Sequence, residues 1–171
     1  MSTMAVKGDP AGYRLAYETG MSAVESQATV LREVRERAGS VLSVAIVAAG
    51  FAAGLALTVD PPSRLGPVGL LGAGIAAIGL GGVVLAAVMI WRPSEGRFLH
   101  DSGQIVGSFV ERDPPWKLPE IHRQLALWLG IQTRLNASML RAKLRTFTWE
   151  LASLLLEAVG VMVAVGDMVH G

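Results

Sequence analysis

Three carboxylates recur along the last apolar stretch of the chain, about residues 148 to 169, at spacings that place them on one side of a helix. Helical residues three and four apart share a face, so these carboxylates lie in line with one hydroxyl and two small residues. The opposite face is dominated by Leu, Val, Met and Ala. We call the polar face the polar seam, and it consists of Glu150, Ser153, Glu157, Gly160, Ala164 and Asp167.

Glu157 lies near the middle of this stretch. A charged residue at the centre of a transmembrane helix costs on the order of 3 kcal/mol on insertion scales and is expected to face protein or water. Three interpretations follow. Glu157 is protonated and hydrogen-bonded inside a three-helix bundle; several copies of the chain turn the seam inward and line a water-filled path that tolerates cations; or the stretch lies along the membrane surface without crossing it.

Other reactive residues form no recognisable site. His100, His122 and His170 are too far apart in sequence to suggest a metal set, and they suggest no nucleophile, base and orienting triad. The chain has no cysteine, and its net charge of +1 gives no reason to expect nucleic acid as a partner. We therefore expect no enzyme activity, no cofactor and no metal.

Two further apolar stretches precede the polar seam. Residues 40 to 59 contain no charge, and their number matches the roughly 20 residues needed to cross a bilayer. Residues 60 to 64 include two prolines that end the helix. Residues 65 to 91 are again uncharged and end at Trp91, followed by Arg92, as is typical of a membrane interface. The pattern predicts a transmembrane hairpin, preceded by too many polar residues for a cleaved signal peptide.

Small residues in the hairpin recur every four positions, a spacing that lets membrane helices approach closely. We expect packing within the hairpin, with packing between subunits as the alternative. A second face of the later span, through Gly72, Ala76 and Gly79, has a similar pattern. The principal candidates for helix packing are Gly50, Gly54, Gly69, Ala73 and Ala77.

Two amphipathic helices flank the hairpin. One covers residues 11 to 38, and the other begins at Pro119 and is expected to continue unbroken into the third span; a short helix between loops is expected in residues 93 to 117. Both long helices alternate apolar spacings of four and three, which predicts that they pair as a stalk. The predicted stalk seam contains Tyr17, Met21, Val24 and Leu31 on the first helix, and Ile121, Leu125, Trp128, Leu135 and Met139 on the second.

Basic residues indicate the orientation. Five Lys or Arg precede the first span, one lies in the hairpin turn, nine lie between the second and third spans, and none follows the third. The positive-inside rule places the N-terminus in the cytoplasm and the C-terminus outside. We expect an all-α membrane protein with a cytoplasmic helix (1–39), a transmembrane hairpin (40–91), a cytoplasmic loop and helix (92–147) and a C-terminal span (148–171).

This layout resembles small bacterial three-span membrane proteins. The resemblance rests on a basic, small-residue entry to the first span at Arg35, Arg37 and Ala38, and on a basic helix carrying Asn136 and Lys143. The layout is also similar to the transmembrane effectors of nucleotide-signalling antiphage systems, such as the Pycsar effectors. Such a resemblance implies membrane disruption after activation by a cyclic nucleotide or a protein partner. The chain shows no recognisable cyclic-nucleotide-binding domain, and no ligand site is transferred to it.

These observations predict an effector of the bacterial inner membrane, in contact with lipid, that forms homo-oligomers and permeabilises or depolarises the membrane. The alternative is a non-enzymatic scaffold or accessory subunit that recruits a partner through its cytoplasmic helices.

Overall fold

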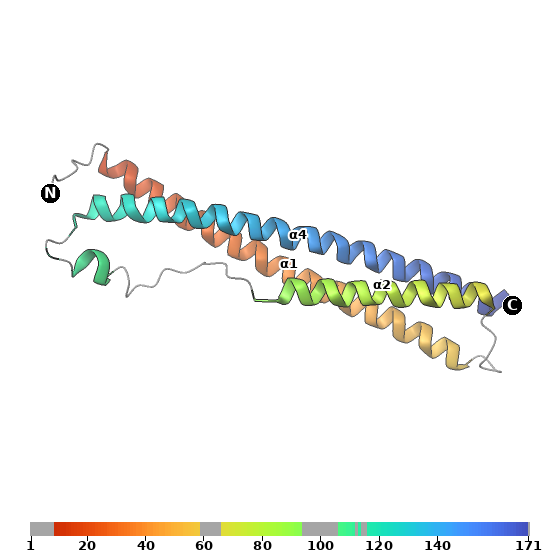
Figure 1. Cartoon of the computed structure of the whole chain (residues 1–171). Helices are drawn as coiled ribbons and strands as arrows, with labels where there is room; N and C mark the ends of the chain where they lie inside the picture. The colour runs from red at the N-terminus through yellow and green to blue at the C-terminus, as the bar shows by residue number, and fades with distance from the viewer. Residues whose placement is uncertain (1–8, 59–65, 94–105, 112, 114–115, 171) are drawn as a thin grey trace. The chain divides into compact units, whose positions relative to one another are not determined.

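The computed structural model describes residues 9–58, 66–93, 106–111, 113 and 116–170, except for the side chains of Thr58, Val110 and His170. The described part is helical throughout its regular structure and contains no strand. Its three long helices are α1 (Pro10–Thr58), α2 (Pro67–Trp91) and α4 (Leu118–His170), drawn in Figure 1. Each of them is long and apolar enough to cross a membrane, which is compatible with the membrane location expected from the sequence. The predicted hairpin turn at residues 60–64 lies outside the described residues.

Both amphipathic helices continue directly into apolar spans. α1 joins the predicted helix at 11–38 to the first span without interruption, because no proline or glycine cluster separates them. α4 confirms the single long helix predicted from Pro119 onward. At its first turn, the Glu120 carboxylate accepts a hydrogen bond of 3.1 Å from the Lys117 backbone N–H, which satisfies one of the donors that a helix start leaves unpaired.

α2 begins and ends where its sequence leads us to expect. Gly66 is extended at the N-cap, with φ −62° and ψ 176°, and Pro67 follows at the first helical position. Proline suits that position because its fixed φ matches the helix and its missing N–H is not needed there. At the other end, Arg92 leaves the helical conformation, with ψ 129°.

The described chain divides into two compact units. In the first unit, residues up to Leu31 of α1 pack against α4 up to Arg141. Val24 and Leu31 of α1 are buried in this unit, and so are Leu125 and Leu129 of α4. The Gln27 side-chain amide donates a hydrogen bond of 2.9 Å to the Thr133 carbonyl.

The stalk seam on α4 differs in detail from the prediction. Leu135 is 58% exposed, whereas Leu129 and Asn136 are buried. The buried positions Leu125, Leu129, Gln132 and Asn136 still alternate spacings of four and three. The predicted period is therefore right, but the buried positions Leu129 and Asn136 each lie one residue after a predicted seam position, Trp128 and Leu135.

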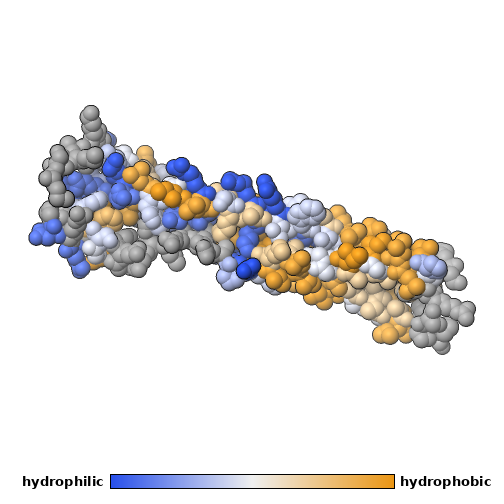
Figure 2. Space-filling model, in the orientation of Figure 1, coloured by the Kyte–Doolittle hydropathy of each residue, from blue (hydrophilic) through white to orange (hydrophobic). Residues whose placement is uncertain are grey.

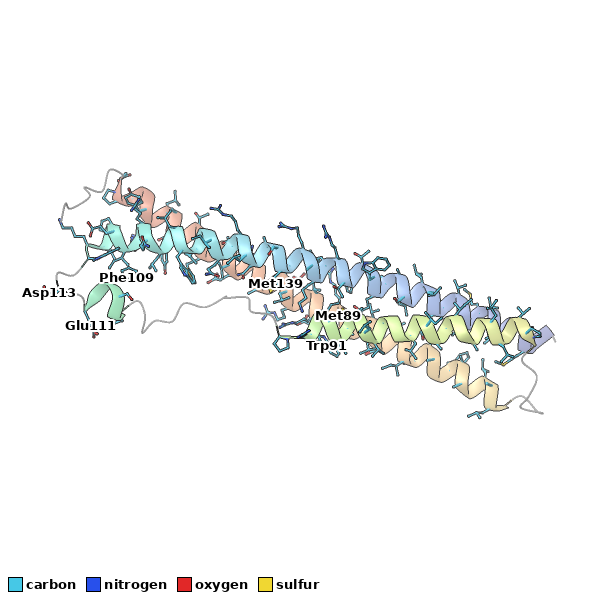
Figure 3. All side chains as sticks on the ribbon, in the orientation of Figure 1. Met89, Trp91, Phe109, Glu111, Asp113 and Met139 are labelled. Atoms are coloured by element: carbon cyan, nitrogen blue, oxygen red, sulfur yellow. The ribbon has the colours of Figure 1, made fainter. Side chains whose placement is uncertain are left out.

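The remaining predicted seam positions are partly buried: Tyr17, Met21, Ile121, Trp128 and Met139. The Tyr17 ring stacks on His122, with centroids 5.5 Å apart. A short π-helical turn, η1 (Val106–Val110), corresponds to the short helix expected between loops. Phe109 of this turn, labelled in Figure 3, lies with its ring centroid 5.2 Å from that of Trp116.

The second unit contains α2 together with α1 from Arg32 and α4 from Ala142. Val34 and Ala38 of α1 meet Ile90 of α2 and Phe147 of α4 in one apolar cluster. Large apolar side chains cover the outside of this unit, including Val47, Phe51 and Leu155, and Figure 2 shows apolar residues gathered over its surface. An apolar exterior of this kind suits a lipid environment better than water.

Candidate functional site: the polar seam beneath α2

The polar seam faces the inside of the second unit. Glu150 is 0% and Glu157 is 1% exposed, and both rank among the largest fully buried side chains. Gly160 and Ala164 are also buried, while Ser153 and Asp167 are partly buried. The six residues predicted to share one helix face therefore do so, and that face is covered within a single chain.

Glycines of α2 form the cover. A Cβ placed on Gly79 would overlap the Glu157 backbone nitrogen and would lie 2.7 Å from its Cα. A Cβ on Gly82 would lie 2.9 Å from the Ser153 Cβ. Real side chains essentially never approach this closely, so only glycine lets α2 lie against the seam at these two positions.

The close approach continues toward the start of α2. A Cβ on Gly72 would lie 2.7 Å from the Ala164 backbone nitrogen, and a Cβ on Gly160 would overlap the backbone of Ala76. Along these contacting pairs the residue numbers increase in α4 while they decrease in α2, so the two segments are antiparallel. They run side by side in Figure 1. By the same register, Glu150 lies level with the buried Ala86 of α2.

The sequence predicts two small-residue faces on α2, and the one that packs against α4 contains Gly72, Ala76 and Gly79. Gly72 and Gly79 are buried, and Gly69 is buried beside them. Ala73 is only partly buried, and Ala77 is exposed.

The close approach expected at Gly50 and Gly54 of α1 is not present within the described chain, because a Cβ at either position would meet nothing within 4 Å. Glycine spacing alone could not distinguish packing on the hairpin partner from packing on the third span.

The two inner carboxylates have no hydrogen-bond partner among the described residues. Both side-chain oxygens of Glu150 and both of Glu157 are buried and unpaired there, and so is Asp167 Oδ2. Even an uncharged polar group costs about 1–3 kcal/mol when it is buried without a hydrogen-bond partner. Carboxyl groups kept in such surroundings on an apolar helix are functional candidates rather than stabilising ones.

A second set of contacts closes the same helix pair at the end of α2. The Lys143 ammonium donates hydrogen bonds to the carbonyls of Met89 at 2.6 Å, Ile90 at 3.0 Å and Arg92 at 3.1 Å. These carbonyls belong to the last turn of α2, where a helix leaves its acceptors unpaired and favours a cation. Sequence analysis did not assign this role to Lys143. The available signal was its position seven residues before Glu150, on the same helix face.

Trp91 attaches α2 to α1 at this end. Its indole Nε1 donates a hydrogen bond of 3.2 Å to the Arg35 carbonyl. Gly39 lies beside the ring, and a Cβ there would be in ordinary van der Waals contact with the indole Cζ2, at 3.4 Å. Figure 3 labels Met89 and Trp91 at the end of α2. All three long helices are thus joined beside the apolar cluster of Val34, Ala38, Ile90 and Phe147.

No group of three or more His, Cys, Asp or Glu residues within the described ranges could hold a metal ion. His122 is instead engaged with Tyr17.

Comparisons with protein-family models, curated proteins and solved structures find no match for this chain.

Proposed function

We propose that this chain is a membrane effector that assembles with copies of itself and lets ions cross the bilayer when α2 moves away from the polar seam. The observation that carries the proposal is the burial of Glu150 and Glu157, without described partners, under α2. The glycines of α2 that contact α4 are Gly72, Gly79 and Gly82, and we call them the glycine face. In the arrangement described, the carboxylates are sealed by their own chain. The arrangement corresponds to a closed state.

Opening requires α2 to separate from α4 and copies of the chain to supply new neighbours. The exposed carboxylates would then gain water and cations, which offsets the loss of helix packing. Rings of carboxylates are a common way to make a cation-selective path. The glycine face suits this exchange because a contact without interdigitating side chains can be broken and remade without rotamer changes.

The setting of this activity is proposed from the sequence. The distribution of Lys and Arg supports an inner-membrane protein with a cytoplasmic N-terminus and an outside C-terminus. The resemblance to antiphage effectors supports a role in defence, with a cyclic nucleotide or a protein as the activator. The paired helices of the first unit would form the cytoplasmic stalk that receives this signal.

A disulfide lock tests the proposed opening. The chain has no native cysteine, so Gly82→Cys combined with Ser153→Cys introduces a single pair whose Cβ atoms lie near 2.9 Å in the closed state. Slight separation of the helices brings this distance to the roughly 3.5–4.5 Å of a disulfide. With a candidate cyclic nucleotide present as activator, we expect proteoliposomes of this variant to be ion-tight when oxidised and to leak after reduction.

Gly81→Cys with Ser153→Cys is the matched control, because Gly81 lies on the open side of α2. Its flux should not respond to reduction. Equal flux from the oxidised and reduced lock variant would refute opening between α2 and α4. Wild-type liposomes that stay ion-tight with and without cyclic nucleotides, together with cells that tolerate overexpression without depolarising, would refute the effector function itself.

A scaffold or accessory subunit is the second candidate, and one observation favours it. The seam packs on the chain's own α2 rather than facing a lumen. Glu157→Gln distinguishes the two functions. Altered conductance with unchanged assembly supports the effector, whereas lost assembly without any conductance supports the scaffold.

A further inference from the structure

Three cations gather where α2 ends. Lys143 contacts the last turn of α2 through three carbonyls, the last of which belongs to Arg92. Arg35 is brought to the same place by its carbonyl, which accepts the Trp91 hydrogen bond. The proximity has an electrostatic consequence: burial lowers the pKa of Lys143, and the charges of Arg35 and Arg92 lower it further.

The cluster lacks a negative partner. None of the three cations forms an ion pair with a carboxylate among the described residues, whereas Arg37 pairs with Glu33 one turn away at 3.7 Å. Arg35 Nε is buried and has no hydrogen-bond partner in the described part of the chain. The Lys143 ammonium is already engaged with carbonyls, so the guanidinium groups are the ones left to bind an anion.

The surroundings indicate where that anion comes from. Arg35 and Arg92 flank the uncharged stretches 40–59 and 65–91, at the same end of both. Val88 is 57% and Met89 is 52% exposed on the last turns of α2, so apolar surface continues directly from the basic cluster. An amphiphile with an anionic head and acyl chains matches both parts, whereas a free phosphate would leave the apolar part unused.

We propose that Arg35 and Arg92 bind the phosphate of an anionic lipid headgroup at the edge of the bilayer, with the Lys143 ammonium behind them adding to the field. Guanidinium groups bind phosphate oxygens through paired hydrogen bonds, and basic pockets between membrane helices are known to hold lipid headgroups. The bound lipid would neutralise the cluster beside the contacts that join α2 to α1 and α4. This inference does not depend on the proposed ion flux.

Native mass spectrometry of the detergent-solubilised, full-length protein tests the site. Phosphatidylglycerol and phosphatidylcholine are titrated separately, and the dissociation constant of the first bound lipid is measured. We expect a clear preference for phosphatidylglycerol. A direct hydrogen bond to a charged group contributes roughly tenfold in affinity, so Arg35→Gln with Arg92→Gln, which removes both guanidinium contacts to the phosphate, should weaken phosphatidylglycerol binding by roughly 100-fold.

Arg32→Gln with Arg145→Gln is the matched control, because it removes the same charge from two exposed positions of the same unit. Its affinity should fall by less than about fivefold. If the double variant does not fold, Arg92→Gln alone replaces it, because Arg92 lies just beyond the end of α2. This single variant should weaken phosphatidylglycerol binding by roughly tenfold. Equal losses in the two double variants would overturn the proposal, and so would equal wild-type affinity for both lipids. Displacement of phosphatidylglycerol by millimolar inorganic phosphate would show a site for soluble anions and would overturn the assignment to lipid.

Discussion

The contact of Gly79 with Glu157 can be tested by adding one methyl group. In Gly79→Ala the new Cβ would lie 2.7 Å from the Glu157 Cα and 2.8 Å from its Cβ. Nonbonded carbons prefer about 3.5–4.0 Å, so α2 and α4 must separate by roughly 1 Å at this point. The obstructing atoms belong mainly to backbone and cannot rotate away.

The separation has a calculable consequence. A gap of about 0.5–1 Å removes a quarter to a half of the dispersion energy of the atoms that face it, and forced overpacking typically costs about 1–3 kcal/mol. We expect the free energy of unfolding to fall by about 1–3 kcal/mol. Unfolding in mixed micelles of dodecyl maltoside and sodium dodecyl sulfate, followed by tryptophan fluorescence, measures this change.

Gly81→Ala is the matched control on the same helix, because a Cβ there meets nothing within 4 Å. It should cause no loss of stability and could gain up to about 1 kcal/mol from helix propensity. If the unfolding free energies of the two variants differ by less than about 0.5 kcal/mol, α2 does not approach α4 at Gly79. In that case α2 does not cover the polar seam.

Three further predictions concern the end of α2. Lys143→Met should lower the free energy of unfolding by about 2 kcal/mol, because three carbonyls lose a charged donor. An unchanged free energy in the same micelle assay would contradict a stabilising role for the Lys143 contacts. Trp91→Phe should cost about 1 kcal/mol through its lost hydrogen bond to Arg35, whereas Trp149→Phe, at a residue that is 73% exposed, should cost less. The lowered pKa of Lys143 means that the unfolded chain binds more protons just below its usual pKa of about 10.4. Stability should therefore rise with pH on approaching that value, and Lys143→Met should lack this rise when unfolding is measured between about pH 8 and 10.5.

Much of the helical architecture could be predicted from periodicity and charge. An uncharged stretch of about 20 residues has few alternatives to a spanning helix, and the absence of a break near Phe147 predicted that α4 is continuous. Spacings of three and four also identified the polar seam, since they follow from helix geometry alone. These features are local, so they are visible in the order of residues.

Which surfaces meet was decided by tertiary structure. Gly50 and Gly54 show the same spacing as packed glycines, yet they remain open, while Gly79 and Gly82 touch α4. Spacing shows that a face is smooth, but the choice between smooth faces depends on the competing contacts of all three helices. The same holds for Lys143, whose acceptors lie more than fifty residues earlier in the chain. The sequence alone thus determined that Glu150 and Glu157 share a face, and only the packing of α2 over that face decided that both are buried.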